Sequence, residues 1–127
     1  MEREMTAQRL NERLTFCGKS REEMVQAIRA AGVNCSESML CQAMNKRTRP
    51  VFAVIRSMCD VISERWVRER VCALTEEVGR MLEDEGESAE GLDMLAPCAG
   101  IVTVLRNGVY IGSYDPEAHR MTDRRIH

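Results

Sequence analysis

The sequence predicts a mainly α-helical protein with four or five short helices at the N-terminus, a long connecting helix and a small C-terminal β-hairpin. Three observations carry this prediction. Apolar residues recur at helical spacing over most of the first 85 residues, capping signatures separate the short helices, and the period changes to alternation near the C-terminus. We expect an N-terminal domain over residues 1–62, a long helix over 63–86, an acidic linker over 87–98, and a hairpin with a basic tail over 99–127.

The first two helices are located by their leucine spacing and by a capping box. Residues 6–16 repeat leucine at helical spacing, which predicts the first helix. Ser20 is followed three residues later by Glu23, so the Ser20 hydroxyl can accept from the Glu23 amide while the Glu23 carboxylate accepts from the Ser20 amide. A second helix should therefore begin near Arg21 and end before Gly32, because glycine readily closes a helix.

A third helix follows after a short turn. Asn34 followed by Glu37 repeats the capping-box spacing, which predicts a helix from Cys35 to about Lys46 and a connection of about three residues. The apolar residues of this helix share one side. The opposite side is polar and almost uncharged, and it carries Ser36, Ser38, Gln42 and Asn45.

The polar side of the third helix suits the reading of base edges in DNA. Gln and Asn can form paired hydrogen bonds with adenine, and Ser can bond to several base edges. Directly after the helix stand Lys46, Arg47 and Arg49, whose charges suit the phosphates beside a groove. The alternative is an ordinary amphipathic helix with a solvated face. We predict that the four polar side chains read bases and that the three basic residues bind phosphate.

The run SMLCQAMNKRTRPVF resembles the recognition helix and the basic, Pro-containing loop of Cro/C1-type (XRE-like) helix-turn-helix regulators of phages and mobile elements. The resemblance extends over about residues 6–62. It implies that the N-terminal domain is a helix-turn-helix domain whose third helix enters the major groove of double-stranded DNA. It also implies a homodimer on an inverted-repeat operator. We therefore expect a transcriptional regulator that acts as a repressor.

The distribution of charge favours the same function. Residues 1–58 contain ten Lys or Arg and six Asp or Glu, whereas residues 59–127 contain eight and fourteen. The N-terminal part is therefore net positive although the whole chain has a formal charge of −2. Because a polyanion is bound through one face, a local positive field can act within an acidic protein.

The long helix carries a heptad seam that predicts dimerisation. Its apolar residues alternate spacings of four and three, and charged residues surround them. A two-fold protein suits a two-fold operator. The alternative is a helix packed back on its own domain, with Trp66 in the core. The predicted dimerisation residues are Val67, Val71, Leu74, Val78 and Met81.

The C-terminal segment changes to a β pattern. Two β-branched and aromatic runs flank Asn107-Gly108, which is a strong signal for a two-residue hairpin turn. Such a turn would pair Arg106 with Val109 and Leu105 with Tyr110. Two strands are marginal alone, so we expect them to pack on the long helix or on a second subunit. The tail beyond Pro116 is expected to be loosely held.

The sequence gives little support for catalysis or for a bound metal. Its six cysteines include no CxxC pair and no neighbouring histidine, so they are expected to act as small apolar residues in a reducing cytoplasm. No Gly-rich phosphate loop and no nucleophile with a nearby base can be identified. We expect a cytoplasmic protein that is not an enzyme, with no cofactor, no metal and no membrane span.

A second function from another class stays open. A helix-turn-helix fold can also serve as a scaffold for a phage-type inhibitor that binds a host protein. In that case the C-terminal hairpin would contact the protein partner. The two hypotheses differ in the expected role of Gln42 and Arg47, which only a DNA regulator needs.

Overall fold

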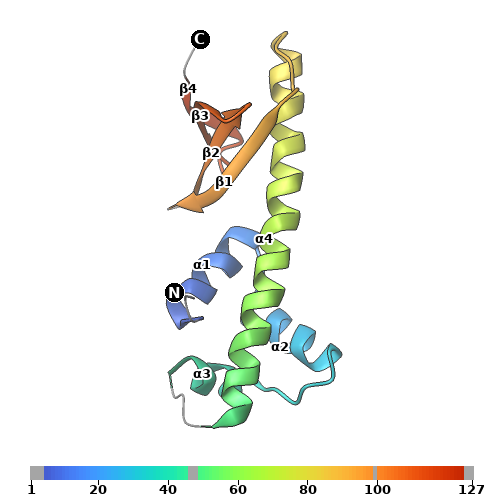
Figure 1. Ribbon diagram of the computed structural model, residues 1–127, viewed down its shortest axis with the longest axis vertical. Coiled ribbons are helices and arrows are strands. Elements are labelled where there is room, and N and C mark those ends of the chain that lie inside the picture. Colours follow the sequence, from blue (N-terminus) through green and yellow to red (C-terminus); the bar gives the residue numbers. More distant parts are fainter. Residues whose placement is uncertain (1–4, 46–48, 99, 125–127) are drawn as a thin grey trace. The chain divides into compact units, whose positions relative to one another are not determined.

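The computed structural model describes residues 5–45, 49–98 and 100–124. They form a mainly helical protein with a small C-terminal antiparallel sheet (Figure 1). The chain divides into two compact units, Met1–Arg68 and Glu69–His127. The elements, in order, are α1 (Ala7–Cys17), α2 (Arg21–Ala30), α3 (Glu37–Asn45), α4 (Pro50–Asp84), β1 (Leu92–Cys98), β2 (Ile101–Arg106), β3 (Val109–Asp115) and β4 (Arg120–Arg124).

The predicted capping box at the start of α2 is confirmed. The Glu23 amide donates to the Ser20 hydroxyl at 3.1 Å, and the Ser20 amide donates to the Glu23 carboxylate at 3.3 Å. These bonds satisfy two of the amide groups that a helix start leaves without partners. The helix begins at Arg21, as predicted, and Gly32 follows its end with a φ of 93°.

The start of α3 differs from the prediction. The helix begins at Glu37 rather than at Cys35, and its cap is Ser36, whose hydroxyl accepts from the Met39 amide at 3.1 Å. Cys35 lies fully buried in the connection before the helix. The connection between α2 and α3 therefore spans residues 31–36 and is longer than the expected three residues.

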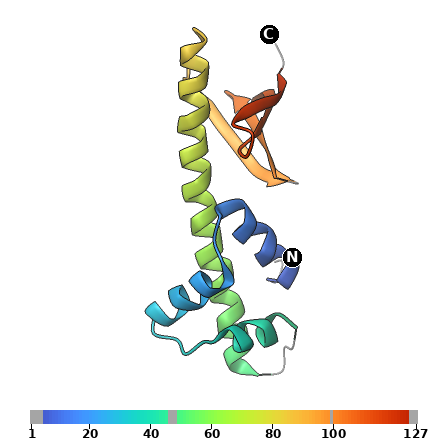
Figure 2. The ribbon, with the colours of Figure 1, turned by 180° about the vertical axis from the view of Figure 1, so that it is seen from behind.

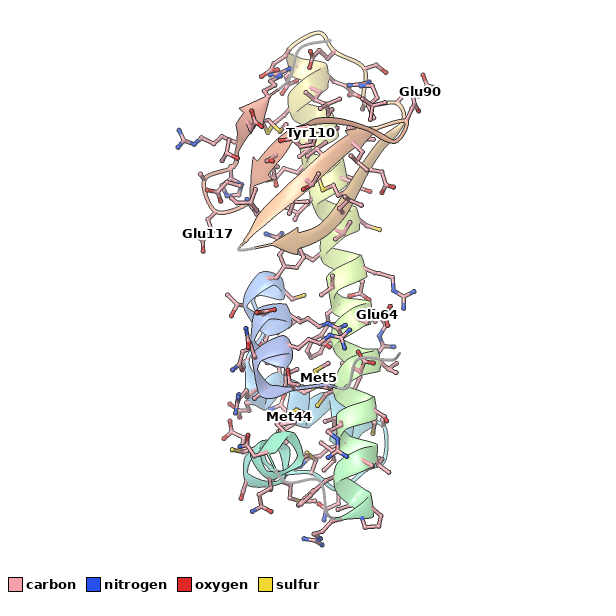
Figure 3. The ribbon with its side chains drawn as sticks, turned by 60° about the vertical axis from the view of Figure 1, so that its left-hand side comes forward. Met5, Met44, Glu64, Glu90, Tyr110 and Glu117 are labelled. Atoms are coloured by element: carbon pink, nitrogen blue, oxygen red, sulfur yellow. The ribbon has the colours of Figure 1, made fainter. Side chains whose placement is uncertain are left out.

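The core of the first unit lies between its helices. Figure 2 shows α1, α2 and α3 gathered around the first part of α4. Each helix contributes apolar residues at helical spacing, and few of them are aromatic. Met5 and Met44, which Figure 3 labels, lie in this core, and Trp66 packs against it. The fully buried side chains include Leu10, Met24, Ile28, Cys35, Leu40, Ala43, Ile55 and Cys59.

A polar contact fastens α1 to α4 beside this core. One guanidinium nitrogen of Arg13 donates to the Asp60 carboxylate at 2.8 Å, to the Asp60 carbonyl at 3.0 Å and to the Ser63 hydroxyl at 2.9 Å. Ser63 is fully buried, so its hydroxyl needs this partner. These bonds fix α1 against α4, around which the other short helices pack.

The long helix begins earlier than predicted. It starts at Pro50, where the fixed backbone of proline suits the first turn of a helix, and it continues without a break to Asp84. The expected fourth short helix and the expected long helix over residues 63–86 are therefore one element. The Glu87 amide donates to the Leu82 carbonyl at 2.8 Å, and Gly86 has a φ of 84°, which closes the helix.

The predicted hairpin is confirmed in its turn and in its register. Asn107 and Gly108 have φ values of 51° and 82°, which is typical of a two-residue hairpin turn. Arg106 pairs with Val109, and Leu105 pairs with Tyr110. A bulge follows next to Leu105.

The hairpin is only the centre of a four-stranded sheet, so the expectation of two strands was wrong. The strand order is β1-β2-β3-β4, and all neighbours are antiparallel. β1 occupies part of the expected linker over residues 87–98, and β4 lies in the expected tail. The two added strands give the hairpin the neighbours that it needs for stability.

One face of the sheet packs with the end of α4 within the second unit (Figure 1). Val102 and Val104 alternate with more exposed neighbours along β2, and both are fully buried. At Gly79 of α4 a methyl group would lie 3.2 Å from the Ala89 side chain, so glycine allows a close approach there. Among the described residues, the large apolar side chains buried in this unit are Leu74, Val78, Leu82, Met94, Val102, Val104 and Tyr114.

This packing buries two of the five predicted dimerisation residues within the chain's own core. Leu74 and Val78 are 1% and 0% exposed within a single chain. Val67, Val71 and Met81 are half-buried. The centre of the seam therefore belongs to the protein's own core, because α4 supplies the apolar surface that the sheet requires.

Among the described residues, no helix is both long enough and apolar enough to cross a membrane.

Candidate nucleic-acid interface

The outward side of α3 carries most of the predicted base-reading residues. Leu40, Ala43 and Met44 point into the core, as their full burial shows. The residues between them are exposed at a spacing that places them on the opposite side of the helix. These exposed residues are Glu37, Ser38, Cys41, Gln42 and Asn45.

The polar side chains on this face bond weakly to one another. The Gln42 amide nitrogen lies 3.4 Å from the Ser38 hydroxyl, and the Asn45 amide nitrogen lies 3.6 Å from the Cys41 sulfur. Long hydrogen bonds between exposed groups contribute little and exchange readily for other partners. The structure therefore brings Ser38, Gln42 and Asn45 onto one accessible surface.

One predicted base-reading residue lies outside this surface, and one residue on the surface was not predicted. Ser36 is half-buried, and its hydroxyl accepts the Met39 amide, so its role is to cap α3. Cys41 stands on the exposed face, but the sequence reasoning did not include it. Its apolar character suggested burial, whereas the helical register turns it outward next to Ser38 and Asn45.

Of the three basic residues predicted to bind phosphate after α3, Arg49 lies within the described residues. Lys46 and Arg47 lie outside the described residues. Arg49 is exposed, and its guanidinium carbon lies 5.3 Å from the centre of the Phe52 ring. Stacking over an aromatic face orders the side chain while the N–H groups at the edge of the guanidinium plane can donate to an anion.

Two further arginines hold α3 in place, and the sequence reasoning missed both. Arg29 of α2 donates from its Nε to the Cys35 carbonyl at 2.6 Å, just before α3. Arg56 of α4 donates from its Nη1 to the Ala43 carbonyl at 3.0 Å, in the last turn of α3. In the sequence each one looks like a charged residue on a solvated helix face.

The buried thiols next to α3 are protonated. Burial raises the pKa of the Cys59 thiol to about 12, and the neighbouring Cys35 and Asp60 add to the effect. Burial also raises the pKa of Cys35, although Arg29 opposes the shift. Both residues therefore act as small apolar side chains. Within the described ranges, no group of three or more His, Cys, Asp or Glu side chains could hold a metal ion.

The second unit contains a separate polar cluster between α4 and the sheet. His119 Nδ1 lies 3.0 Å from the Glu77 carboxylate. Burial raises the pKa of Tyr114 to about 12, with the carboxylate of Glu77 as the next cause. The Tyr114 hydroxyl is buried without a well-formed hydrogen bond, although it lies near enough to Glu77 to interact electrostatically.

Comparison of the chain with protein-family models, with curated proteins and with solved structures finds no match. The exposed side of α3, together with Arg49 and Arg56, is the surface with the most specific chemistry. We call the set Ser38, Cys41, Gln42 and Asn45 the α3 face.

Proposed function

We propose that this protein is a sequence-specific DNA-binding transcriptional regulator that acts as a repressor. In this proposal α2 and α3 form a helix-turn-helix, and α3 is the recognition helix in the major groove. One observation carries it: the outward side of α3 is accessible, polar and uncharged apart from Glu37 at its start, and Arg56 bonds to its last turn while the exposed Arg49 follows four residues after its end in the sequence.

The chemistry of the α3 face suits base edges better than plain solvent. Gln42 and Asn45 each offer a donor and an acceptor on one amide group, which matches the N6 and N7 atoms of adenine. Ser38 adds a hydroxyl one turn before Gln42. Charged side chains, which dominate ordinary solvated faces, are missing from these positions. The buried side of α3 fixes the helix, so the face is presented on a rigid element.

Phosphate binding would supply most of the affinity. Arg49 is ordered by Phe52, and Arg56 is ordered by Ala43, so both lose little conformational freedom on binding. Residues 1–58 are net positive, whereas the remainder is acidic. Binding should therefore use the first unit and should weaken steeply with salt, because phosphate contacts release counterions.

The proposal includes a homodimer on an inverted repeat, because one short helix reads few base pairs. The seam on α4 is not a free dimer surface at Leu74 and Val78, which are buried in each chain. A dimer would have to use other residues, such as the exposed Val54 and Val61 on α4. Those valines are seven residues apart and therefore lie on one side of the helix.

A second candidate function is supported by the C-terminal unit. This unit is a folded sheet on α4 rather than an isolated hairpin, and it exposes Leu95 and Val109 by 52% and 55%. Exposed apolar residues on a folded element are typical of protein-binding surfaces. In this reading the protein is an inhibitor that binds a host protein through its C-terminal unit.

Substitution at Gln42 distinguishes the two functions. For a DNA regulator, Gln42→Ala removes paired bonds to a base and should weaken specific binding by about 1–3 kcal/mol, which is about fivefold to 150-fold. The matched control is Gln8→Ala, because Gln8 is exposed on α1 and its amide donates to Glu12 in the same helix. Affinity is measured on DNA from the protein's own upstream region. Equal affinity of both variants would contradict base reading by α3.

A further inference from the structure

The placement of α3 depends on two arginine side chains from neighbouring helices. Arg29 reaches the carbonyl of Cys35 before the helix, and Arg56 reaches the carbonyl of Ala43 in its last turn. A bond from a charged donor to a carbonyl is stronger than a neutral one. The two ends of α3 are therefore tied to α2 and to α4 independently of the apolar contacts on its buried side.

The bond from Arg56 has an electrostatic consequence. The last carbonyl groups of a helix carry a partial negative charge, which would repel a nearby phosphate. A guanidinium at this end offsets that charge. Arg56 uses Nη1 for the Ala43 carbonyl, and a guanidinium has five N–H donors in a rigid plane. Donors remain for a second acceptor on the same side chain.

The position of Arg56 allows its remaining N–H groups to donate to an acceptor outside the protein. The residue is half-buried, so its side chain is held and not freely mobile. It lies two helical turns after Arg49, which precedes α4 and stacks on Phe52. Arg56 thus stands at the C-terminal end of α3, and Arg49 follows that end by four residues in the sequence. The DNA backbone would pass here if α3 entered the major groove.

We infer that Arg56 is a positioning residue that joins a DNA phosphate to the last turn of α3. One part of its guanidinium holds the Ala43 carbonyl, and another part donates to a phosphate oxygen. Contact with the backbone is thereby transmitted to the helix that reads the bases. This inference rests on the proposed function and extends it, because it assigns a phosphate contact to a residue that the charge pattern did not identify.

Two substitutions separate the two roles of Arg56. Arg56→Gln removes the charge, and its amide ends at the position of the arginine Nε, short of the Nη1 that reaches the Ala43 carbonyl. The slope of log affinity against log salt should fall by about one. Arg56→Lys keeps the charge but lacks the planar set of donors. It should keep most of the salt slope, while the ratio of specific to non-specific affinity falls by about tenfold. Arg65→Gln is the control, since Arg65 is exposed on α4.

The experiment measures the affinity of full-length protein at four or more salt concentrations, on upstream DNA and on an unrelated fragment, together with the melting temperature of each variant. A wild-type slope for Arg56→Gln would overturn the inference, whatever its melting temperature. A wild-type specificity ratio for Arg56→Lys would overturn the positioning role. If the wild-type protein bound neither fragment, the proposed function itself would fail, which is a distinct outcome.

Discussion

Single polar side chains determine where the short helices begin and end. Ser20 and Ser36 supply hydroxyl caps for α2 and α3, while Arg29 and Arg56 bond to carbonyl groups at the two ends of α3. The hydroxyl caps and the Arg56 bond satisfy groups that a helix end leaves without partners, whereas the Arg29 bond holds the connection before α3. The α3 face therefore owes its position to residues outside it as well as to its own buried side.

The capping box of α2 leads to a prediction at this scale. Ser20→Ala removes the acceptor for the Glu23 amide and should lower the free energy of unfolding by about 1 kcal/mol. Ser57→Ala is the matched control, because Ser57 is exposed inside α4, where alanine is favourable. Both variants are compared by urea denaturation. An equal effect of the two substitutions would show that the cap contributes nothing specific.

The pH dependence of stability gives a second prediction for a single residue. Desolvation opposes ionisation of Glu77, but the nearby Tyr114 hydroxyl, the hydrogen bond with His119 and the charge of His119 outweigh it, so the pKa of Glu77 falls below its ordinary value of 4.5. The charged carboxylate therefore stabilises the folded state above about pH 4.5. This contribution is lost as the pH falls through the lowered folded-state pKa.

The test is urea denaturation at several pH values between 7 and 3. Glu77→Gln should show a smaller loss of stability on acidification than the wild-type protein. Glu76→Gln provides the control, because Glu76 is the exposed neighbour on the same helix. If Glu77→Gln and the wild-type protein lost stability in parallel, the contact with His119 and Tyr114 would not be the cause.

At the scale of elements, α4 serves two cores. Its first part closes the core around α1, α2 and α3, and its last part supports the sheet. Leu74→Ala should therefore lower the free energy of unfolding by about 2–5 kcal/mol, through lost burial and a cavity. Cys72→Ala is the control, because Cys72 is exposed on the same helix.

The outcome for Leu74→Ala also decides whether the apolar heptad positions of α4 pack in the chain's own core or against a second subunit. The structure predicts a lower melting temperature and an unchanged molecular mass by light scattering. If the variant kept the melting temperature of the wild-type protein but lost mass, Leu74 would face a second subunit. The same pair of measurements on Val61→Glu tests the exposed side of α4.

The sequence predicts the local features of these elements better than the distant contacts. The Ser20 capping box and the Asn107-Gly108 turn depend on residues three positions apart or less, so their patterns are sufficient. β4 could not be predicted, because its sequence RMTDR is polar and becomes a strand only by pairing with β3. Likewise, Arg56 acquires its role only when α3 packs beside α4, which no local pattern encodes.

At the scale of the whole molecule, the charge divides along the chain. The formal charge is −2, yet the basic excess lies in residues 1–58 and the acidic excess beyond them. In the second unit, Arg124 pairs with Glu85 and Glu87, so some of its few basic groups are already engaged. A nucleic acid should therefore bind to the first unit, and the second unit should add little affinity for DNA.

Footprinting of the full-length protein on its own upstream DNA, at two salt concentrations, tests the central proposal most directly. The account predicts a protected inverted repeat with half-sites about 10 base pairs apart, centre to centre, and protection that weakens steeply at the higher salt. Uniform weak binding along every fragment, or no protection at either salt concentration, would contradict a regulator that reads DNA through α3.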